Sequence, residues 1–304
     1  MFDPIHRRDF LAGTATAAAA VVAGVVAPST AATAVATRRR DIKKGVVFGM
    51  LNKLLETMSI EDTFKTARDC GFDGVEAYTT TDPKKVAELR AASDRTGFKI
   101  HSIMNQAHWQ HPLSSADRAT VEKSMDGMKT SLQNARDLAA DTVLLVPAVV
   151  DAKTRYAEAY VRSQRQIRAL LPLAEELGVV IAIEEVWNKF LLSPIEFARY
   201  VDEFNTPHVQ AYFDVGNVVL YGYPQDWIRT LGERIKKVHI KDFKVEKSTW
   251  QWTNLYDGAV DWPEVHKAFG EIGYSGWFTA ELGGGDAEYL RDVAKRMDRI
   301  IAGA

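Results

Sequence analysis

One short segment of the chain, Val179-Val180-Ile181-Ala182-Ile183-Glu184, leads five apolar residues directly into a single carboxylate. β-Branched residues in a short apolar run are typical of a strand that is buried on both faces. Gly178 stands immediately before the run, at the end of an amphipathic stretch. Glycine in that place supplies the left-handed residue with which many helices end. The segment therefore predicts a helix, a tight connection and a parallel strand that ends in a potential ligand.

The same arrangement, an apolar run followed by one carboxylate or imidazole, recurs three times later in the chain. Residues 209–213 (VQAYF) precede Asp214, residues 235–238 (IKKV) precede His239, and residues 277–280 (WFTA) precede Glu281. Asp214 lies 30 residues after Glu184, and His239 lies 25 residues after Asp214, about one strand–helix–strand unit each. Polar residues at the carboxyl ends of successive parallel strands share the mouth of a (β/α) barrel. We therefore expect Glu184, Asp214, His239 and Glu281 to converge on a divalent metal site.

Similar runs along the chain predict eight strands in all. They lie at residues 45–51, 74–78, 99–105, 142–148, 179–185, 209–214, 235–241 and 277–282. Regular alternation of strands with helices argues for an α/β fold, a single-domain (β/α)₈ TIM barrel spanning residues 37–304. The alternative is an open doubly wound sheet. The segment after the first strand, Gly49-Met50-Leu51-Asn52-Lys53, lacks the glycine-rich phosphate loop that many such sheets carry.

The first 36 residues resemble an export signal rather than part of the fold. They contain Arg7-Arg8-Asp9-Phe10-Leu11, then an Ala/Val-rich stretch, and small-residue cleavage options at Ala32-Thr33-Ala34 or Ala34-Val35-Ala36. We predict a twin-arginine signal peptide at residues 1–36 and a mature protein in the periplasm or outside the cell. An ordinary signal peptide or an N-terminal anchor is the alternative. No later stretch approaches the length of a bilayer span, so no stable membrane span is expected after processing.

Charge and cysteine content exclude further classes. The formal net charge is −2, so a nucleic-acid partner is not expected. The single cysteine, Cys70, excludes an intrachain disulfide. A small-molecule substrate is expected instead.

The four candidate ligands offer three carboxylates and one imidazole. Oxygen-rich ligation with one nitrogen suits Mn²⁺ best, with Mg²⁺ and Co²⁺ as alternatives, because closed structural zinc sites use cysteine or more histidine. Zn²⁺ stays possible. The alternative for any single carboxylate is an ion pair with a neighbouring lysine or arginine.

These motifs resemble the xylose isomerase-like barrel family of sugar and sugar-phosphate isomerases and epimerases, of which D-tagatose 3-epimerase and L-ribulose-5-phosphate 3-epimerase are types. The motifs that carry the resemblance span the second half of the chain: Ala182-Ile183-Glu184, Phe213-Asp214-Val215-Gly216-Asn217, Val238-His239-Ile240-Lys241-Asp242 and Ala280-Glu281. The resemblance implies that Glu184, Asp214, His239 and Glu281 hold one divalent metal ion. It also implies that Glu184 and Glu281 act as acid and base.

Three positions depart from the tagatose type of the family. Asn217 stands where that type has a second histidine, Val245 where it has an arginine, and Phe190 where it has an acidic residue. The Asp-x-Gly-Asn and His-x-Lys-Asp forms are closer to the ribulose-phosphate branch. An exported protein, however, will rarely meet sugar phosphates, so the resemblance leaves the substrate open.

Two long loops, residues 105–112 and 243–262, are expected to overhang the mouth and carry substrate contacts. Polar and aromatic residues in these loops or near the strand ends are the candidates: Glu76, His101, His108, Trp187, Asn217, Lys241 and Trp252. Glu185 is expected to face the helical layer or a neighbouring cation, because adjacent strand residues point to opposite faces. Burial of the loop aromatics in a subunit contact is the alternative, and it would make the protein a homo-oligomer.

The leading functional hypothesis is a metal-dependent carbohydrate isomerase or epimerase that removes the proton next to a keto-sugar carbonyl through an enediolate. A lyase or deglycosidase acting on 3-keto-glycosides is the first alternative, because the same enediolate can expel a β-substituent. A non-catalytic sugar-binding protein is the second. An endonuclease IV-like repair enzyme is not expected, because it would need more metal ligands than a chain with seven histidines offers. The net charge of −2 also argues against DNA binding.

Overall fold

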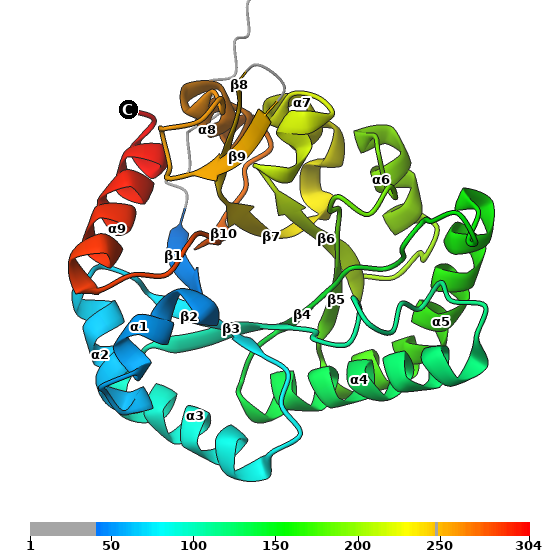
Figure 1. Ribbon diagram of the computed structural model, residues 1–304, viewed down its shortest axis with the longest axis horizontal. Helices are drawn as coiled ribbons and strands as arrows, with labels where there is room; N and C mark the ends of the chain where they lie inside the picture. The colour runs from blue at the N-terminus through cyan, green and yellow to red at the C-terminus, as the bar shows by residue number, and fades with distance from the viewer. Residues whose placement is uncertain (1–40, 247–248) are drawn as a thin grey trace, which may run out of the picture. The chain divides into compact units, whose positions relative to one another are not determined.

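Eight parallel strands close into a barrel in the order β1-β10-β7-β6-β5-β4-β3-β2 (Figure 1). The computed structural model describes residues 41–246 and 249–304. The barrel strands are β1 (Ile42–Val47), β2 (Gly74–Tyr78), β3 (Lys99–Met104), β4 (Thr142–Leu145), β5 (Val180–Glu184), β6 (Val209–Asp214), β7 (Ile235–Ile240) and β10 (Gly276–Ala280). The closed parallel barrel confirms the predicted (β/α)₈ class.

Helices alternate with the strands and surround the barrel (Figure 1). The long helices are α2 (Ile60–Asp69), α3 (Pro83–Thr96), α4 (Arg118–Asp137), α5 (Tyr156–Leu177), α6 (Pro194–Asp202), α7 (Pro224–Leu231), α8 (Trp262–Glu271) and α9 (Ala287–Ala302). Short elements complete the chain: η1 (Phe48–Leu51), α1 (Asn52–Leu55), η2 (Asn217–Leu220) and η3 (Gly232–Arg234). Gly178 ends α5 with a φ of 67°, a left-handed conformation that glycine adopts without a steric cost.

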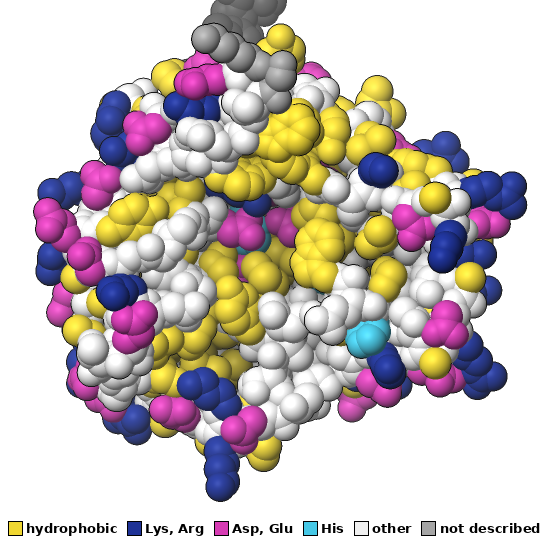
Figure 2. Space-filling model, viewed as in Figure 1, with side chains coloured by type: hydrophobic (Ala, Val, Ile, Leu, Met, Phe, Trp, Pro, Cys, Tyr) yellow, Lys and Arg dark blue, Asp and Glu magenta, His cyan; other side chains and the backbone are white. Residues whose placement is uncertain are grey.

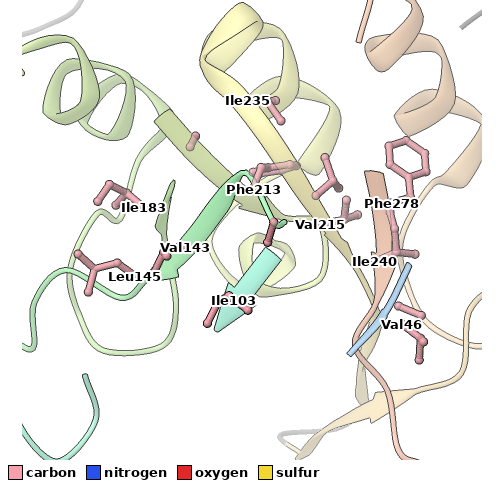
Figure 3. Close-up of a cluster of buried hydrophobic side chains, with 14 of the residues drawn as sticks. Val46, Ile103, Val143, Leu145, Ile183, Phe213, Val215, Ile235, Ile240 and Phe278 are labelled. Atoms are coloured by element: carbon pink, nitrogen blue, oxygen red, sulfur yellow. The ribbon is translucent and has the colours of Figure 1, made fainter. Parts of the chain in front are cut away.

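The main hydrophobic core lies between the strands and the helices. Strand residues that face outward fill it, and Figure 3 labels Val46, Ile103, Val143, Leu145, Ile183, Phe213 and Ile240 among them. A smaller apolar cluster of Leu144, Val146, Ala182 and Tyr212 is separate from this core. Successive residues such as Val143, Leu144 and Leu145 thus join different clusters because strand side chains alternate between the two faces. Alternation also turns every second strand residue toward the barrel interior, where the candidate ligands lie.

Several strands are shorter than the sequence suggests. The first strand was expected at residues 45–51, but β1 ends at Val47 and residues 48–51 form η1. The strand expected at residues 142–148 ends at Leu145.

The loop expected at residues 243–262 contains an antiparallel hairpin of β8 (Asp242–Glu246) and β9 (Thr249–Thr253). Asp242 holds the segment of residues 243–262 in place. Its carboxylate accepts hydrogen bonds from the backbone N–H groups of Phe243, Tyr256 and Val260 and from the Trp262 indole. A Cβ on Gly258 would lie 2.0 Å from Asp242 Oδ1, so only glycine fits there. The aromatic residues of this segment are therefore held on a structured platform.

The leader predicted at residues 1–36 lies outside the described residues. Among the helices in the described part of the chain, none has the length and apolar character needed to cross a membrane.

A buried ion pair closes the end of the barrel where the strands begin. Lys237, in β7, is buried, and its Nζ lies 2.8 Å from Asp141 Oδ1 just before β4. Lys236 Nζ lies 2.9 Å from the other oxygen of Asp141. Burial alone would raise the pKa of Asp141, but the charge and hydrogen bond of Lys237 hold it well below its ordinary value.

We expect Asp141→Asn to lower the free energy of unfolding at pH 7 by about 1–3 kcal/mol, because it leaves the Lys237 ammonium buried without its counter-ion. The lowered pKa of Asp141 in the folded state means that this stabilisation is complete above the ordinary aspartate pKa of about 3.9 and is lost as the pH falls below it. Urea unfolding at pH 7 and pH 3 measures both effects. The exposed Asp126→Asn is the control, and an equal loss at both pH values would contradict the ion-pair account.

Candidate metal centre

Four side chains from the strand ends converge at the mouth of the barrel. Glu184 ends β5, Asp214 ends β6, His239 lies in β7, and Glu281 follows β10 directly. Each offers one ligand atom, and these atoms all lie within 4.8 Å of one another. In Figure 2 acidic side chains and an imidazole are visible at the bottom of the hollow in the centre of this face, surrounded by hydrophobic side chains. The tertiary structure thus brings together the four residues that the sequence singled out.

The imidazole of His239 stands between carboxylates on both of its nitrogens. Its Nδ1 lies 2.8 Å from Glu184 Oε1, 3.3 Å from Glu281 Oε2 and 3.7 Å from Asp214 Oδ2. Its Nε2 lies 2.8 Å from Oε2 of Glu76, which is fully buried in β2. The other oxygen of Glu76 accepts a hydrogen bond of 2.9 Å from Ser102 Oγ. A carboxylate beside Nε2 accepts the proton carried there, so Nδ1 is the nitrogen available to the cluster.

The turn after β6 fixes the carboxylate of Asp214. Its Oδ1 accepts hydrogen bonds of 2.8 Å from the backbone N–H groups of Gly216 and Asn217. Its Oδ2 is thereby left facing the cluster, 2.9 Å from Lys241 Nζ. A Cβ on Gly216 would lie 2.9 Å from the Lys241 carbonyl oxygen, so the motif needs glycine at this close approach. The Asp-x-Gly-Asn pattern is thus a turn that aims one carboxylate oxygen.

Glu185 was expected to face either the helical layer or a neighbouring cation. It is buried, and its Oε1 accepts a hydrogen bond of 2.9 Å from the Asp214 backbone N–H. Burial raises the pKa of this carboxyl well above its ordinary value. No ion pair of Glu185 with a cation is found among the described residues, so the expected neighbouring cation is wrong. Glu185 supports β6 from beside the cluster.

The cluster holds more negative charge than its one lysine balances. Lys241 Nζ lies 2.6 Å from Glu281 Oε2 as well as near Asp214. Burial opposes ionisation of Glu281, but Lys241 and His239 hold its pKa at about 2. Burial raises the pKa of Glu184 to about 7. Burial would favour neutral His239, but the surrounding carboxylates, above all Glu281, raise its pKa well above the ordinary value. Such a site favours an additional cation.

A cavity of about 200 Å³ lies over the cluster. Five of the seven predicted substrate contacts line it: His108, Trp187, Asn217, Lys241 and Trp252. The predicted ligands Glu184 and Glu281 and the loop residue Trp109 also line the cavity, together with Met104, Leu144 and Val186, for which no prediction was made from the sequence. Period-two counting could have found Val186, which lies two residues after Glu184 and therefore on the same side of the strand.

Glu76 and His101 are not among the residues that line this cavity. Glu76 contacts His239 from inside the barrel, as described above. His101 is buried, stacks on Trp277 with ring centroids 4.2 Å apart, and lies 3.2 Å from Thr279 Oγ1. Both side chains therefore lie in the barrel interior and contact other interior residues instead of the substrate cavity.

The remaining predicted contacts form a rigid wall. Trp187 stacks on Trp252 of β9, with centroids 4.8 Å apart and planes 23° apart, and its Nε1 donates to the Asn217 carbonyl. The Asn217 amide donates in turn to the Glu185 carbonyl. His108 Nδ1 accepts a hydrogen bond from the Val146 backbone N–H, and burial lowers the pKa of His108 to about 4, so its ring is neutral at pH 7.

A (β/α)₈ barrel with a buried cluster of carboxylates and one imidazole at the mouth defines a class of enzymes, and comparison with known proteins identifies the family. The family model described as "Xylose isomerase-like TIM barrel" matches residues 64–300. The chain belongs to this family.

Relatives and solved structures agree with that assignment. The putative L-ribulose-5-phosphate 3-epimerase SgbU of Escherichia coli (strain K12) is 26% identical over 251 residues, which cover 75% of this chain and 85% of the relative. A D-tagatose 3-epimerase-like protein of known structure has a TM-score of 0.71 at 18% identity, covering 85% of this chain and 98% of its own. The IOLI protein, solved with a zinc atom, has a TM-score of 0.72 at 19% identity, covering 86% of this chain and 98% of its own. These two structures share the fold, and the name of the E. coli relative supports an isomerase-type enzyme.

Proposed function

We propose that the protein is a metal-dependent carbohydrate isomerase or epimerase that removes and returns the proton next to a keto-sugar carbonyl. One observation carries the proposal: three carboxylates and an imidazole, all buried except the half-buried Glu281, share one cluster beneath an aromatic-walled cavity. The name of the E. coli relative, a 3-epimerase, supports the same reaction type.

The donor set fits a divalent cation. Glu184, Asp214 and Glu281 would supply oxygen ligands and His239 Nδ1 the nitrogen. Oδ2 of Asp214 is buried and faces the cluster, while the turn occupies Oδ1. Oxygen-rich sites of this kind suit Mn²⁺, which is our first proposal, with Mg²⁺ or Co²⁺ next. The zinc atom of the IOLI protein keeps Zn²⁺ among the candidates.

A bound divalent cation would stabilise negative charge that develops on the oxygen of the substrate carbonyl. The chain's own groups perform the proton transfers. One of the carboxylates Glu184 and Glu281 takes the proton from carbon and the other returns one, which inverts the carbon if they face opposite sides of the substrate. Lys241, held beside Glu281, keeps that carboxylate ionised. The stacked Trp187 and Trp252 exclude water from the reacting centre.

Solvent isotope exchange tests the reaction type. The Mn²⁺-loaded protein is incubated in deuterium oxide with a panel of keto-sugars and keto-glycosides, and deuterium at the α-carbon is followed by NMR. We expect incorporation in at least one compound. No incorporation in any compound, with metal bound at full occupancy, would contradict the proposal.

A lyase or deglycosidase acting on 3-keto-glycosides is the second candidate. The aromatic wall favours it, because Trp187 and Trp252 offer a stacking surface for a glycoside. Release of the aglycone in the same NMR experiment distinguishes this reaction from epimerisation. Retained metal and sugar binding without any exchange would instead support a non-catalytic sugar-binding protein.

We also propose that the protein acts outside the cytoplasm. The support is the pair Arg7-Arg8 followed by Phe10-Leu11 and an Ala-rich stretch. Replacing both arginines by lysine is expected to keep the full-length chain in the cytoplasm, as measured by cell fractionation. Unchanged export of that variant would contradict the twin-arginine route.

Glu76→Leu tests how the metal centre is supported. Leucine has a similar size but cannot accept the Nε2 proton of His239, so the ring loses the partner that orients it. We expect metal affinity to fall by about 10–100-fold, measured by calorimetric titration with Mn²⁺. Glu76→Gln keeps an acceptor and should recover part of the affinity. Equal affinity in the wild type and Glu76→Leu would contradict a supporting role.

A further inference from the structure

A second cavity adjoins the one over the metal cluster. It has a volume of about 420 Å³ and lies between the end of β9 and the connection from β10 to α9. The two cavities share three wall residues, Lys241, Trp252 and Glu281. The remaining walls of the second are Thr253, Asn254, Leu282, Gly283 and Tyr289. A ligand seated over the cluster can therefore extend past Glu281 without leaving the protein surface.

We infer that the second cavity is a subsite for an uncharged ring attached to the sugar at the metal centre, so that the substrate is a neutral glycoside. This inference rests on the proposed carbohydrate function, because it assigns the reacting sugar to the first cavity. The attached ring can be a second sugar or an aryl aglycone, since the C–H face of a pyranose and the face of an aryl ring are both apolar and stack on aromatic side chains.

The sizes of the two cavities favour a ligand of two rings. Cavities that hold small-molecule ligands usually measure about 300–1,000 Å³. The cavity over the cluster, at about 200 Å³, is smaller than this range, and the adjoining cavity is twice as large. A free monosaccharide would leave the larger cavity unused, whereas a glycoside occupies both.

The charges around the second cavity exclude a phosphate. Lys241 is the single cation among the residues that line either cavity, and its ammonium is already within 2.9 Å of Asp214 and 2.6 Å of Glu281. A phosphate monoester would bring a charge of about −1.5 to −2 beside the Glu281 carboxylate, and no lysine or arginine in either lining is free to pair with it. This cavity is therefore unsuited to the sugar phosphate named for the E. coli relative.

The walls suit a ring with an apolar face. Trp252 faces Lys241, whose Nζ lies 4.7 Å from the ring centroid, and contributes to both cavities. Trp187 stacks against Trp252 and holds the indole in place. Tyr289 and Leu282 add apolar surface, and Asn254 and Thr253 add polar groups at the edge. Aromatic platforms with a few polar groups at the rim are a common way to bind uncharged amphipathic rings.

A ladder of substrates tests the inference. One 3-keto-aldose, whose C3 carbonyl stays free when C1 is glycosylated, is compared with its phenyl glycoside, its glucoside and its phosphate ester, using the metal-loaded protein. We expect kcat/KM for at least one of the two neutral glycosides to exceed that of the free sugar by about 10-fold or more, and the phosphate ester to be poorest. Comparing kcat/KM of the phenyl glycoside with that of the glucoside decides whether the attached ring is an aryl aglycone or a second sugar. A phosphate ester that is the best substrate, or a free sugar equal to both glycosides, would overturn the inference.

Tyr289→Ala provides the structural test. It is expected to lower the ratio of glycoside to free-sugar kcat/KM by about 10-fold, with Tyr289→Phe keeping most of the ratio because the ring remains. Tyr223→Ala is the matched control, since Tyr223 is exposed and lines neither cavity. Asn254→Ala serves as a second variant if Tyr289→Ala does not fold. An unchanged ratio in both cavity variants would overturn the subsite.

Binding separates a failure of the subsite from a failure of the proposed function. The same four compounds are titrated calorimetrically into the wild type, Tyr289→Ala and Tyr223→Ala. If a glycoside binds more tightly than the free sugar and this advantage is lost only in Tyr289→Ala, the subsite is supported. If at the same time no compound exchanges deuterium, the isomerase proposal alone is rejected. Equal binding of all compounds to all three proteins rejects the subsite alone.

Discussion

Glu281→Gln is expected to lower kcat by about 10²–10⁴-fold while the barrel stays folded. The substituted amide keeps the shape and one oxygen donor of the carboxylate but has no useful basicity. In the native protein, Lys241 and His239 hold the pKa of Glu281 at about 2 against the opposing effect of burial, so the carboxylate is ionised at every pH at which the protein would be assayed. The loss should therefore fall on the proton transfer and be nearly independent of pH between 6 and 9.

The kinetic readout is the rate of deuterium exchange at the α-carbon with metal at saturating concentration. Metal affinity should fall only moderately, which separates the loss of basicity from the loss of the ion. Glu88→Gln, an exposed change on α3, is the matched control. Activity of Glu281→Gln within a few-fold of the wild type would remove Glu281 from the proton transfer.

His239→Ala and Asp214→Ala are each expected to abolish stable metal binding, with a larger loss of affinity than the roughly 10–100-fold that follows removal of a supporting residue. Each variant removes a buried donor that faces the other three. Secondary structure should persist, because the outward-facing strand residues build the main core and the ligands lie inside the barrel at its mouth. Metal content by plasma mass spectrometry after dialysis gives the answer.

Both variants should also lose stability, each for its own reason. His239→Ala leaves the fully buried Glu76 without its partner on Nε2, whereas Asp214→Ala leaves two backbone N–H groups without an acceptor. Each loss costs about 1–3 kcal/mol of the free energy of unfolding. His111→Ala, an imidazole in the loop after β3, is the control. Full metal occupancy in either variant would remove that residue from the coordination set.

The sequence predicted the barrel and the four converging side chains for a local reason. Strand side chains alternate between the two faces of the sheet, and the carboxyl ends of parallel strands meet at one mouth. The position of a ligand at the end of an apolar run can therefore be predicted. The runs before Glu184 and Asp214 therefore placed both residues before any tertiary contact was known. The resemblance to the xylose isomerase-like family rested on those same positions, and the family model confirms it. The leader, the oligomeric state and the identity of the metal stay predictions.

Contacts between elements remote in sequence were decided only by closure of the barrel. Glu76 and His239 are 163 residues apart, and nothing in the local sequence of β2 distinguishes a substrate contact from a partner of the histidine. His101 also looked like a mouth residue, yet it stacks on Trp277 inside the barrel. The register between strands determines which interior side chains share a layer, and that register is a property of the closed sheet.

The walls of the mouth depended on tertiary structure in the same way. The sequence marked Trp187 and Trp252 as substrate contacts but could not show that they stack on each other, or that Asp242 anchors the hairpin that carries Trp252. The second cavity exists because that hairpin approaches the connection between β10 and α9. Local patterns determine which way a side chain points from its own strand, whereas the packing of distant segments determines what it meets there.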